Sequence, residues 1–299
     1  MTVSLRQYAY YPGCVARGAC PELSVAMAKV AGRLGLDLVG LEGAACTGAG
    51  VLQERNPELA DTLNARTFAM AERLGLPILT ICSTCQGVFS GTLYRLNRNP
   101  AWRAKINGNL ADLGYEYRGT ARAVHLLWVL VEEIGLDRLR ELVVRPLRGL
   151  KVAAFYGCYI LRPSWVVGTD EKPERLTYLE QVVRVLGAEP VEFPGEYKCC
   201  GFPILTTNRR NSLMMAGTHL TDARRRGADL MVTPCPLCHL NLDAYQPEAV
   251  KYRDPTVRLP VLHLPQLLGL AFGFSPKELR LDRHVVSALP VVERLSVRV

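Results

Sequence analysis

The chain has 299 residues, of which 49% are hydrophobic, and it carries a formal net charge of +8 at pH 7. Such a hydrophobic content supports a sizeable core and excludes a disordered protein. No apolar run reaches the roughly 20 residues of a membrane-spanning helix, and the amino-terminus lacks the apolar segment of a secretory signal. The positive charge is scattered and aromatic residues make up only 7% of the chain, so we expect no nucleic-acid site and no transmembrane segment.

The first half of the chain is predicted to alternate strands with helices. Its strands are expected at residues 8–11, 37–41 and 77–81. A helix follows each of the first two strands, and the second helix ends at Gly75, a residue suited to the left-handed end of a helix. Four large apolar residues lie on one side of that helix, namely Leu59, Leu63, Met70 and Leu74. Residues 97–119 form an extra segment that the second half lacks.

The second half repeats this order after a linker at residues 145–149. Its strands are expected at residues 152–155, 189–193 and 229–233, again with helices between them. Alternating strands and helices predict parallel sheets with right-handed crossovers. We therefore predict an α/β protein with an internal duplication. Its two related halves, residues 1–149 and 150–299, each contain a parallel sheet flanked by helices.

Nine of the ten cysteines fall into two copies of one pattern. In each half, one cysteine follows the first strand. A second cysteine, separated from a glycine by one residue, follows the middle strand. A CxxC motif follows the third strand. In both copies 33 residues separate that glycine from the CxxC motif. The first copy consists of Cys14, Cys46, Cys82 and Cys85, and the second of Cys158, Cys199, Cys200, Cys235 and Cys238. Because ligand sites gather at the C-terminal ends of parallel strands, we expect each set to meet at one rim.

The two cysteine sets differ at one position, where Thr47 stands in place of Cys200. Four thiolates hold either a tetrahedral zinc ion or a 4Fe–4S cluster, and a dithiol redox centre is a third alternative. Five thiolates exceed what zinc needs, so the second set favours a polynuclear iron–sulfur centre. For the first set a four-cysteine cluster, a zinc ion and a cluster with a non-cysteine ligand all stay open. The spare thiol, Cys20, is either the missing ligand or, as we favour, a small buried hydrophobic residue.

Three histidines stand near these motifs. His239 directly follows the second CxxC motif, where it either serves a metal-bound sulfur or a substrate thiolate, or packs at the start of a helix; we favour packing. His125 and His263 recur at equivalent places in a tail that both halves share, which indicates a common structural contact. Glycine-rich phosphate-binding motifs are missing from the sequence, so we expect any flavin on a partner protein.

The cysteine frame resembles the cysteine-rich CCG domain, and the chain from Tyr8 to about Ser287 resembles the B subunit of heterodisulfide reductase. The matching segments are YYPGC, FYGCYILRP, KCCGFP, TPCPLCHLNLD, PVLHLPQLLGLAFG and LDRHVVS. The resemblance implies a noncubane 4Fe–4S cluster on five cysteines in each half. It also implies that the mixed disulfide of coenzyme M and coenzyme B is split between the two clusters, with electrons from a ferredoxin-like C subunit. Similar subunits occur in bacterial sulfur metabolism and in an unusual class of succinate:quinone reductase.

Carried over to this chain, the resemblance assigns a noncubane 4Fe–4S cluster to Cys158, Cys199, Cys200, Cys235 and Cys238. Because Thr47 breaks the first motif, it assigns a second 4Fe–4S cluster or a zinc ion to Cys14, Cys46, Cys82 and Cys85. We expect a cytoplasmic iron–sulfur redox subunit that reduces a small disulfide, or oxidises thiols in reverse, while exchanging electrons with a C-type iron–sulfur subunit. The alternative is a non-catalytic relay or anchoring subunit of a succinate:quinone reductase-like complex, whose membrane link would come through partners. A purely structural zinc protein is the third interpretation.

Overall fold

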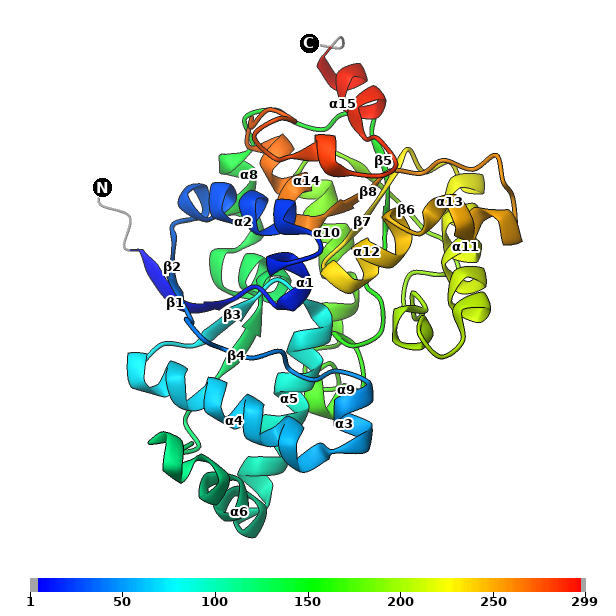
Figure 1. The fold of residues 1–299 in the computed structure, drawn as a ribbon. Helices are drawn as coiled ribbons and strands as arrows, with labels where there is room; N and C mark the ends of the chain where they lie inside the picture. The colour runs from blue at the N-terminus through cyan, green and yellow to red at the C-terminus, as the bar shows by residue number, and fades with distance from the viewer. Residues whose placement is uncertain (1–4, 297–299) are drawn as a thin grey trace.

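Each half of the chain forms a four-stranded parallel sheet flanked by helices (Figure 1). The structure is a computed structural model that describes residues 5–296. The first sheet has the order β2-β1-β3-β4 and consists of β1 (Arg6–Tyr11), β2 (Leu36–Gly40), β3 (Ile78–Thr80) and β4 (Ala123–His125). The second has the order β6-β5-β7-β8 and consists of β5 (Lys151–Ala154), β6 (Glu189–Val191), β7 (Leu230–Thr233) and β8 (Val261–His263). The identical order confirms the predicted α/β fold with an internal duplication.

The fourth strand of each sheet was missing from the sequence prediction, which gave three strands per half. β4 and β8 each have three residues and end at the histidine of the shared tail. A helix begins at the very next residue in both cases, at Leu126 and at Leu264. Because no turn residues separate strand from helix, the sequence gives no sign of where the strand ends.

Helices and short single turns connect the strands. The first half contains α1 (Cys14–Arg17), α2 (Pro21–Leu34), α3 (Val51–Arg55), α4 (Pro57–Leu74), α5 (Ser83–Arg98), α6 (Pro100–Leu110), η1 (Ala111–Leu113), α7 (Leu126–Trp128), η2 (Val129–Ile134) and α8 (Leu136–Leu142). The second contains α9 (Ser164–Val167), η3 (Pro173–Thr177), α10 (Tyr178–Val185), η4 (Phe202–Ile204), α11 (Arg209–Arg225), α12 (Pro236–Asp243), α13 (Gln246–Ala249), η5 (Val250–Tyr252), α14 (Leu264–Ala271), η6 (Leu281–Arg283) and α15 (Leu289–Ser296). None of the helices within residues 5–296 is long and apolar enough to cross a membrane.

The buried face of α4 is not the apolar side identified in the sequence. Leu59 and Leu74 on that side are 44% and 46% exposed. The helix instead buries small and polar residues together with Phe68. One of them, Asp61, accepts hydrogen bonds from Thr92 and Arg95 of the neighbouring helix α5, so a polar residue occupies a core position because it is fully paired.

The tail helices of each half pack against a helix of the other half, and the two halves share their hydrophobic core. The tail of the first half, α7 and η2, packs on α10 of the second, and α14 of the second half packs on α2 of the first (Figure 1). One face of both sheets joins a single hydrophobic cluster with α2, α10 and α14. The other faces form a second cluster that also draws on both halves. The halves therefore lack separate cores, and the division into domains at residues 149 and 150 stays a prediction.

The strand order of each sheet places a crevice between its two central strands. In the order β2-β1-β3-β4 the chain goes from β1 to one side and then returns to add β3 on the other. Ligand sites in open α/β sheets lie at this switch point, beyond the C-terminal ends of the strands. The equivalent point of the second sheet lies between β5 and β7. The cysteine motifs follow the strands at both switch points.

Candidate metal centre

The five cysteines of the second copy meet at the C-terminal edge of their sheet. Cys158 follows β5, Cys199 and Cys200 follow β6, and Cys235 and Cys238 stand at the N-cap and in the first turn of α12. All five cysteines line one small cavity. Cys200, Cys235 and Cys238 are buried, and the other two are half-buried. The structure thus brings the whole predicted set together, while its binding of a metal stays a prediction.

Two glycines make room for these sulfur atoms. Gly201 has a φ of +94°, and its N–H donates to Cys199 Sγ at 3.4 Å. A Cβ atom there would lie 2.6 Å from the backbone oxygen of Ser212. Gly157, with a φ of +75°, would place a Cβ atom 3.0 Å from Cys238 Sγ. Only glycine adopts both this backbone conformation and this close approach without strain.

Hydrogen bonds within the set stabilise thiolates at two positions. The hydrogen bond from Cys158 lowers the pKa of Cys199 to about 3, and the pKa of Cys158 itself is raised by the same bond. Burial opposes ionisation of Cys235, but hydrogen bonds from Cys238 and other neighbours bring its pKa well below the ordinary value. Thiolates are the form in which cysteine binds metals, so the set is suited to a cationic centre.

The turn that carries Cys199 and Cys200 is held by two buried side chains absent from the sequence predictions. Asn241 Nδ2 donates to the carbonyl oxygen of Cys200 at 2.7 Å. His219 Nε2 donates to the carbonyl oxygen of Cys199 at 2.9 Å. Neither side chain has an equivalent at the corresponding place in the first cysteine copy, so the repeat offered no signal for them.

The four cysteines of the first copy form a similar but more open set. Cys14 follows β1, Cys46 follows β2, and Cys82 and Cys85 begin α5. The sulfur atoms of Cys14 and Cys46 lie 3.5 Å apart, and Cys82 Sγ accepts the N–H of Cys85 at 3.4 Å. Cys82 and Cys85 are buried, but Cys14 and Cys46 are exposed. A cavity of about 280 Å³, lined also by Arg17, lies beside the exposed pair.

Thr47 occupies the place of the fifth thiol. Its side chain is buried, with 1% exposure, and its Oγ1 lies 3.9 Å from Cys85 Sγ. The carbonyl oxygen of Thr47 accepts a hydrogen bond from Asn64 at 3.1 Å, as that of Cys200 does from Asn241. The first set therefore presents four sulfur atoms and one hydroxyl oxygen in the frame where the second set presents five sulfur atoms.

The two sets touch across the boundary between the halves. Thr84 Oγ1 of the first half lies 3.3 Å from Cys235 Sγ. Ser83 donates both its N–H and its Oγ hydrogen to the carbonyl oxygen of Pro234, at 3.3 and 3.2 Å. The two candidate centres are therefore direct neighbours.

His125 and His263 make the same contact in opposite directions. His125 Nδ1 accepts the N–H of Leu127 at 3.0 Å, so the proton sits on Nε2, which donates to the carbonyl oxygen of Pro234 at 3.0 Å. His263 Nε2 donates to the carbonyl oxygen of Ile81 at 3.0 Å. Pro234 and Ile81 each directly precede a CxxC motif of the other half. The predicted common contact is thus confirmed, and it crosses between the halves.

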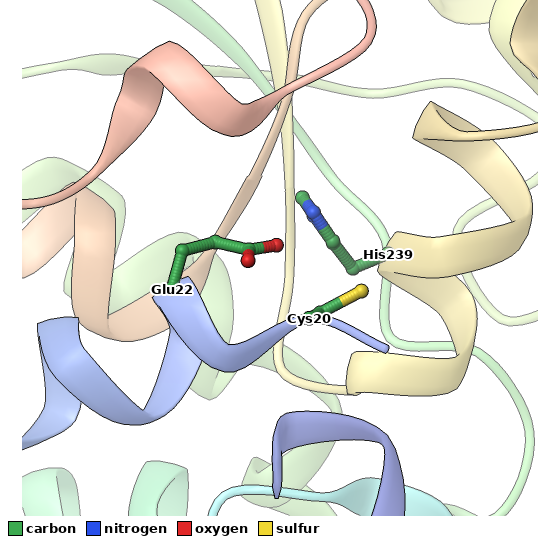
Figure 2. A group of neighbouring side chains, drawn as sticks. All are labelled: Cys20, Glu22 and His239. Carbon is green, nitrogen blue, oxygen red and sulfur yellow. The ribbon is translucent and has the colours of Figure 1, made fainter. Parts of the chain in front are cut away.

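Cys20 does not join the first set. Its side chain points towards Glu22 and His239 instead, and the three side chains converge in Figure 2. His239 is buried, and its ring packs edge-on against His284 at 4.9 Å between ring centroids. The structure thus agrees with a buried Cys20 and a packed His239, and places them together.

Two features of the cysteine sets fit an iron–sulfur centre. The second set offers only sulfur atoms as donors, which suits iron–sulfur clusters better than hard cations. Glycines without a Cβ atom stand against the last cysteine of each CxxC motif, Gly157 at Cys238 and Gly13 at Cys85. The backbone therefore leaves space beside the same sulfur atom in both halves.

The sequence profile of the cysteine-rich domain (CCG) matches the chain twice, at residues 8–90 and 152–243. The chain belongs to the CCG cysteine-rich domain family. It is 38% identical, over 95% of its length and 98% of the relative, to the 8-methylmenaquinol:fumarate reductase membrane anchor subunit of Wolinella succinogenes. It is 32% identical, over 95% of each chain, to the B subunit of the ferredoxin/F(420)H(2)-dependent CoB-CoM heterodisulfide reductase of Methanosarcina acetivorans. The predicted resemblance to the B subunit of heterodisulfide reductase is confirmed.

A solved structure shares the fold. The crystal structure of a hypothetical protein from Helicobacter pylori superposes with a TM-score of 0.76 at 16% sequence identity. The match covers 95% of this chain and 52% of that chain. At this identity the likeness concerns the fold alone.

Proposed function

We propose that this protein is an iron–sulfur redox subunit of a multisubunit reductase, of the heterodisulfide reductase B type. The observation that carries the proposal is the direct contact of the two CxxC motifs, in which Thr84 Oγ1 of the first lies 3.3 Å from Cys235 Sγ of the second. Two structural zinc sites would need no such contact, whereas electron exchange between centres favours a short separation. Relatives that are subunits of reductases support the same conclusion.

The second set would hold a 4Fe–4S centre of the noncubane type through its five thiolates. The first set, with Thr47 at the fifth position, would hold a second 4Fe–4S cluster or a zinc ion. When bound, such iron–sulfur centres supply one-electron transfer to and from sulfur groups. The chain itself excludes water from Cys200, Cys235 and Cys238, which are all buried.

A small disulfide is the substrate class whose sulfur atoms suit the all-sulfur donors of the second set. Cys158 and Cys199, its half-buried cysteines, line a small cavity of about 10 Å³ together with Tyr159, Phe202 and Leu237, among other residues. Reduction of a disulfide takes two electrons and two protons and yields two thiols, so a partner iron–sulfur subunit must deliver the electrons. The cavity at the second set shares no lining residue with the cavity at Cys14 and Cys46. We therefore place the sulfur chemistry at the second set rather than between the two.

A second candidate is a relay or anchoring subunit that connects partner subunits to a quinone. Two observations favour it, namely the hydroxyl of Thr47 in place of the fifth thiol and the 38% identity to a fumarate reductase membrane anchor subunit. A relay does not bind a substrate sulfur at its centres. One set of five cysteines and one set of four cysteines with Thr47 are therefore sufficient for a relay.

Reciprocal exchange of the differing residue tests the proposal. Cys200→Thr gives the second set the donors of the first, and Thr47→Cys does the reverse. On anaerobically purified protein, iron analysis and electron paramagnetic resonance should show loss of the five-thiolate signal in Cys200→Thr and a second such signal in Thr47→Cys. Thr256→Cys, which adds a thiol on the surface, is the matched control and should change neither.

Activity of the assembled complex separates the two candidates. Under the first, Cys200→Thr abolishes reduction of small disulfides. Under the second, disulfide reduction is absent from the unmodified complex and only quinone-linked activity responds to the variant. A protein that contains zinc and no iron would refute both candidates.

A further inference from the structure

A second kind of metal-ligand cluster uses none of the residues of the two cysteine sets. Cys20 and Glu22 stand at the start of α2, and His239 lies on α12 of the other half. The potential ligand atoms of these three side chains lie within 4.8 Å of one another. Figure 2 shows the sulfur atom and the carboxylate directed to the space beside the imidazole ring. A second group, His239, Asp243 and His284, meets the same distance limit and shares His239.

The cluster is sealed from solvent. Its side chains are almost fully buried, at 5% exposure for Cys20, 5% for Glu22, 2% for His239, 4% for Asp243 and 8% for His284. Carboxylates are rarely buried to this extent unless they are paired or bind a metal. The cation beside Glu22 is Arg283, at 3.3 Å, and its own side chain is 46% exposed. Asp243 is held by the N–H groups of Val285 and Val286, at 2.9 and 3.1 Å.

Two imidazole nitrogens in the cluster lack a partner. His239 Nδ1 and His284 Nδ1 are buried without a hydrogen bond among the described residues. Buried polar atoms are satisfied in the great majority of cases, so each unsatisfied one calls for an explanation. His284 Nε2 accepts a hydrogen bond from Gln266 Nε2 at 2.9 Å, so the neutral ring carries its proton on Nδ1. His239 is therefore left as the imidazole of the cluster that can supply a ligand nitrogen.

We propose that Cys20, Glu22 and His239 bind a divalent transition-metal ion, with zinc the metal that a thiolate, an imidazole and a carboxylate suit best. Asp243 and His284 adjoin His239, and the His239 ring packs edge-on against that of His284. The ion joins α2 of the first half to α12 of the second, one residue beyond Cys238. It serves as a cross-link between the halves that does not change redox state. This inference does not rest on the proposed function.

Zinc binding to site variants tests the proposal. The full chain, purified anaerobically, is titrated with Zn²⁺ against a competing chelator. Because the first cysteine set is also a candidate zinc site, the measurements use a background with Cys14→Ser and Cys46→Ser. We expect this background to bind one zinc ion, and Cys20→Ser or His239→Gln to weaken that binding at least about tenfold. Absence of zinc binding in the background, or equal binding in the variants, overturns the proposal.

A second measurement leaves the three proposed ligands unchanged, so it does not depend on whether the ligand variants fold. Zinc K-edge X-ray absorption of the background protein should show one sulfur neighbour and a shell of nitrogen and oxygen. A shell of several sulfur atoms would place the zinc in the remaining cysteines and refute the site. Added Zn²⁺ should also raise the melting temperature of the background protein, and an unchanged melting temperature would count against a cross-link between the halves.

Discussion

Each tail histidine is expected to act on the candidate metal centre of the opposite half. His263, at the end of β8, donates a hydrogen bond to the carbonyl oxygen of Ile81, the residue before Cys82. In His263→Phe this donor is lost and the carbonyl stays buried. A buried polar group left without its partner costs about 1–3 kcal/mol, so the free energy of unfolding should fall by that amount.

The equivalent change in the first half should cost less. The carbonyl oxygen of Pro234 accepts from His125 but also from the N–H and Oγ of Ser83. In His125→Phe it keeps those two bonds, so the loss should be near the net value of one hydrogen bond, about 0.5–1.5 kcal/mol. The two variants thus make the same chemical change. His263→Phe leaves the carbonyl oxygen of Ile81 without a donor, whereas His125→Phe leaves that of Pro234 with two.

Redox potentials and urea unfolding together check this reasoning. A net hydrogen bond of about 0.5–1.5 kcal/mol corresponds to roughly 20–60 mV for a one-electron centre. His263→Phe should shift the redox potential of the centre at Cys82 and Cys85. His125→Phe should shift the redox potential of the centre at Cys235 and Cys238. If the first set holds zinc, its zinc affinity replaces the potential as the readout. The reasoning is refuted if each variant shifts the centre of its own half, or if His125→Phe is the more destabilising.

Two further predictions concern stability. Burial lowers the pKa of His125 to about 4 and that of His263 to about 3, whereas unfolded histidine titrates near about pH 6.5. The unfolded chain therefore binds more protons below that pH, and each histidine should cost the fold roughly 2 kcal/mol by about pH 5 relative to neutral pH. Urea unfolding across this range checks the loss, and a His125→Phe/His263→Phe double variant should depend less on pH; an equal dependence would contradict the assignment. Gly87→Ala should destabilise by about 1–3 kcal/mol, because the added Cβ would lie 2.5 Å from the backbone oxygen of Tyr159 in the other half. Gly108→Ala in α6 meets nothing within 4 Å and should stabilise by up to about 1 kcal/mol; similar melting temperatures for the two variants would count against this packing argument.

The fold class was predictable because the duplication shows the same alternation of strands and helices twice in the sequence. Strands that end in a cysteine motif were located correctly, since the motif marks where each strand stops. β4 and β8 were missed because each consists of only two apolar residues and a histidine, and a helix begins at the next residue. The buried face of α4 was misjudged because its core position is taken by Asp61, whose charge is paired with Arg95 and is invisible to a hydrophobic pattern.

The candidate site was predictable to the extent that its residues are repeated. Both cysteine sets assemble as expected because their strands end at the same edge of each sheet. The family resemblance implied that the two sets lie near each other, but the residues that touch could not be predicted, since they depend on how one half packs on the other. The cluster of Cys20, Glu22 and His239 was out of reach for the same reason, because its members come from different halves and belong to no repeat.

The contact of each tail histidine with the opposite half explains how the first cysteine set keeps its arrangement without a fifth thiol. Cys82 stands where it does because His263 of the other half holds the carbonyl oxygen before it. Thr47 is fixed through its own carbonyl oxygen by Asn64, a bond that does not involve its side chain. Neither restraint uses the atom that distinguishes threonine from cysteine, so the substitution alters the donor set and leaves the frame unchanged. The contact from Thr84 to Cys235 is therefore independent of the fifth ligand, and the first cysteine set lies beside the second whichever residue stands at position 47.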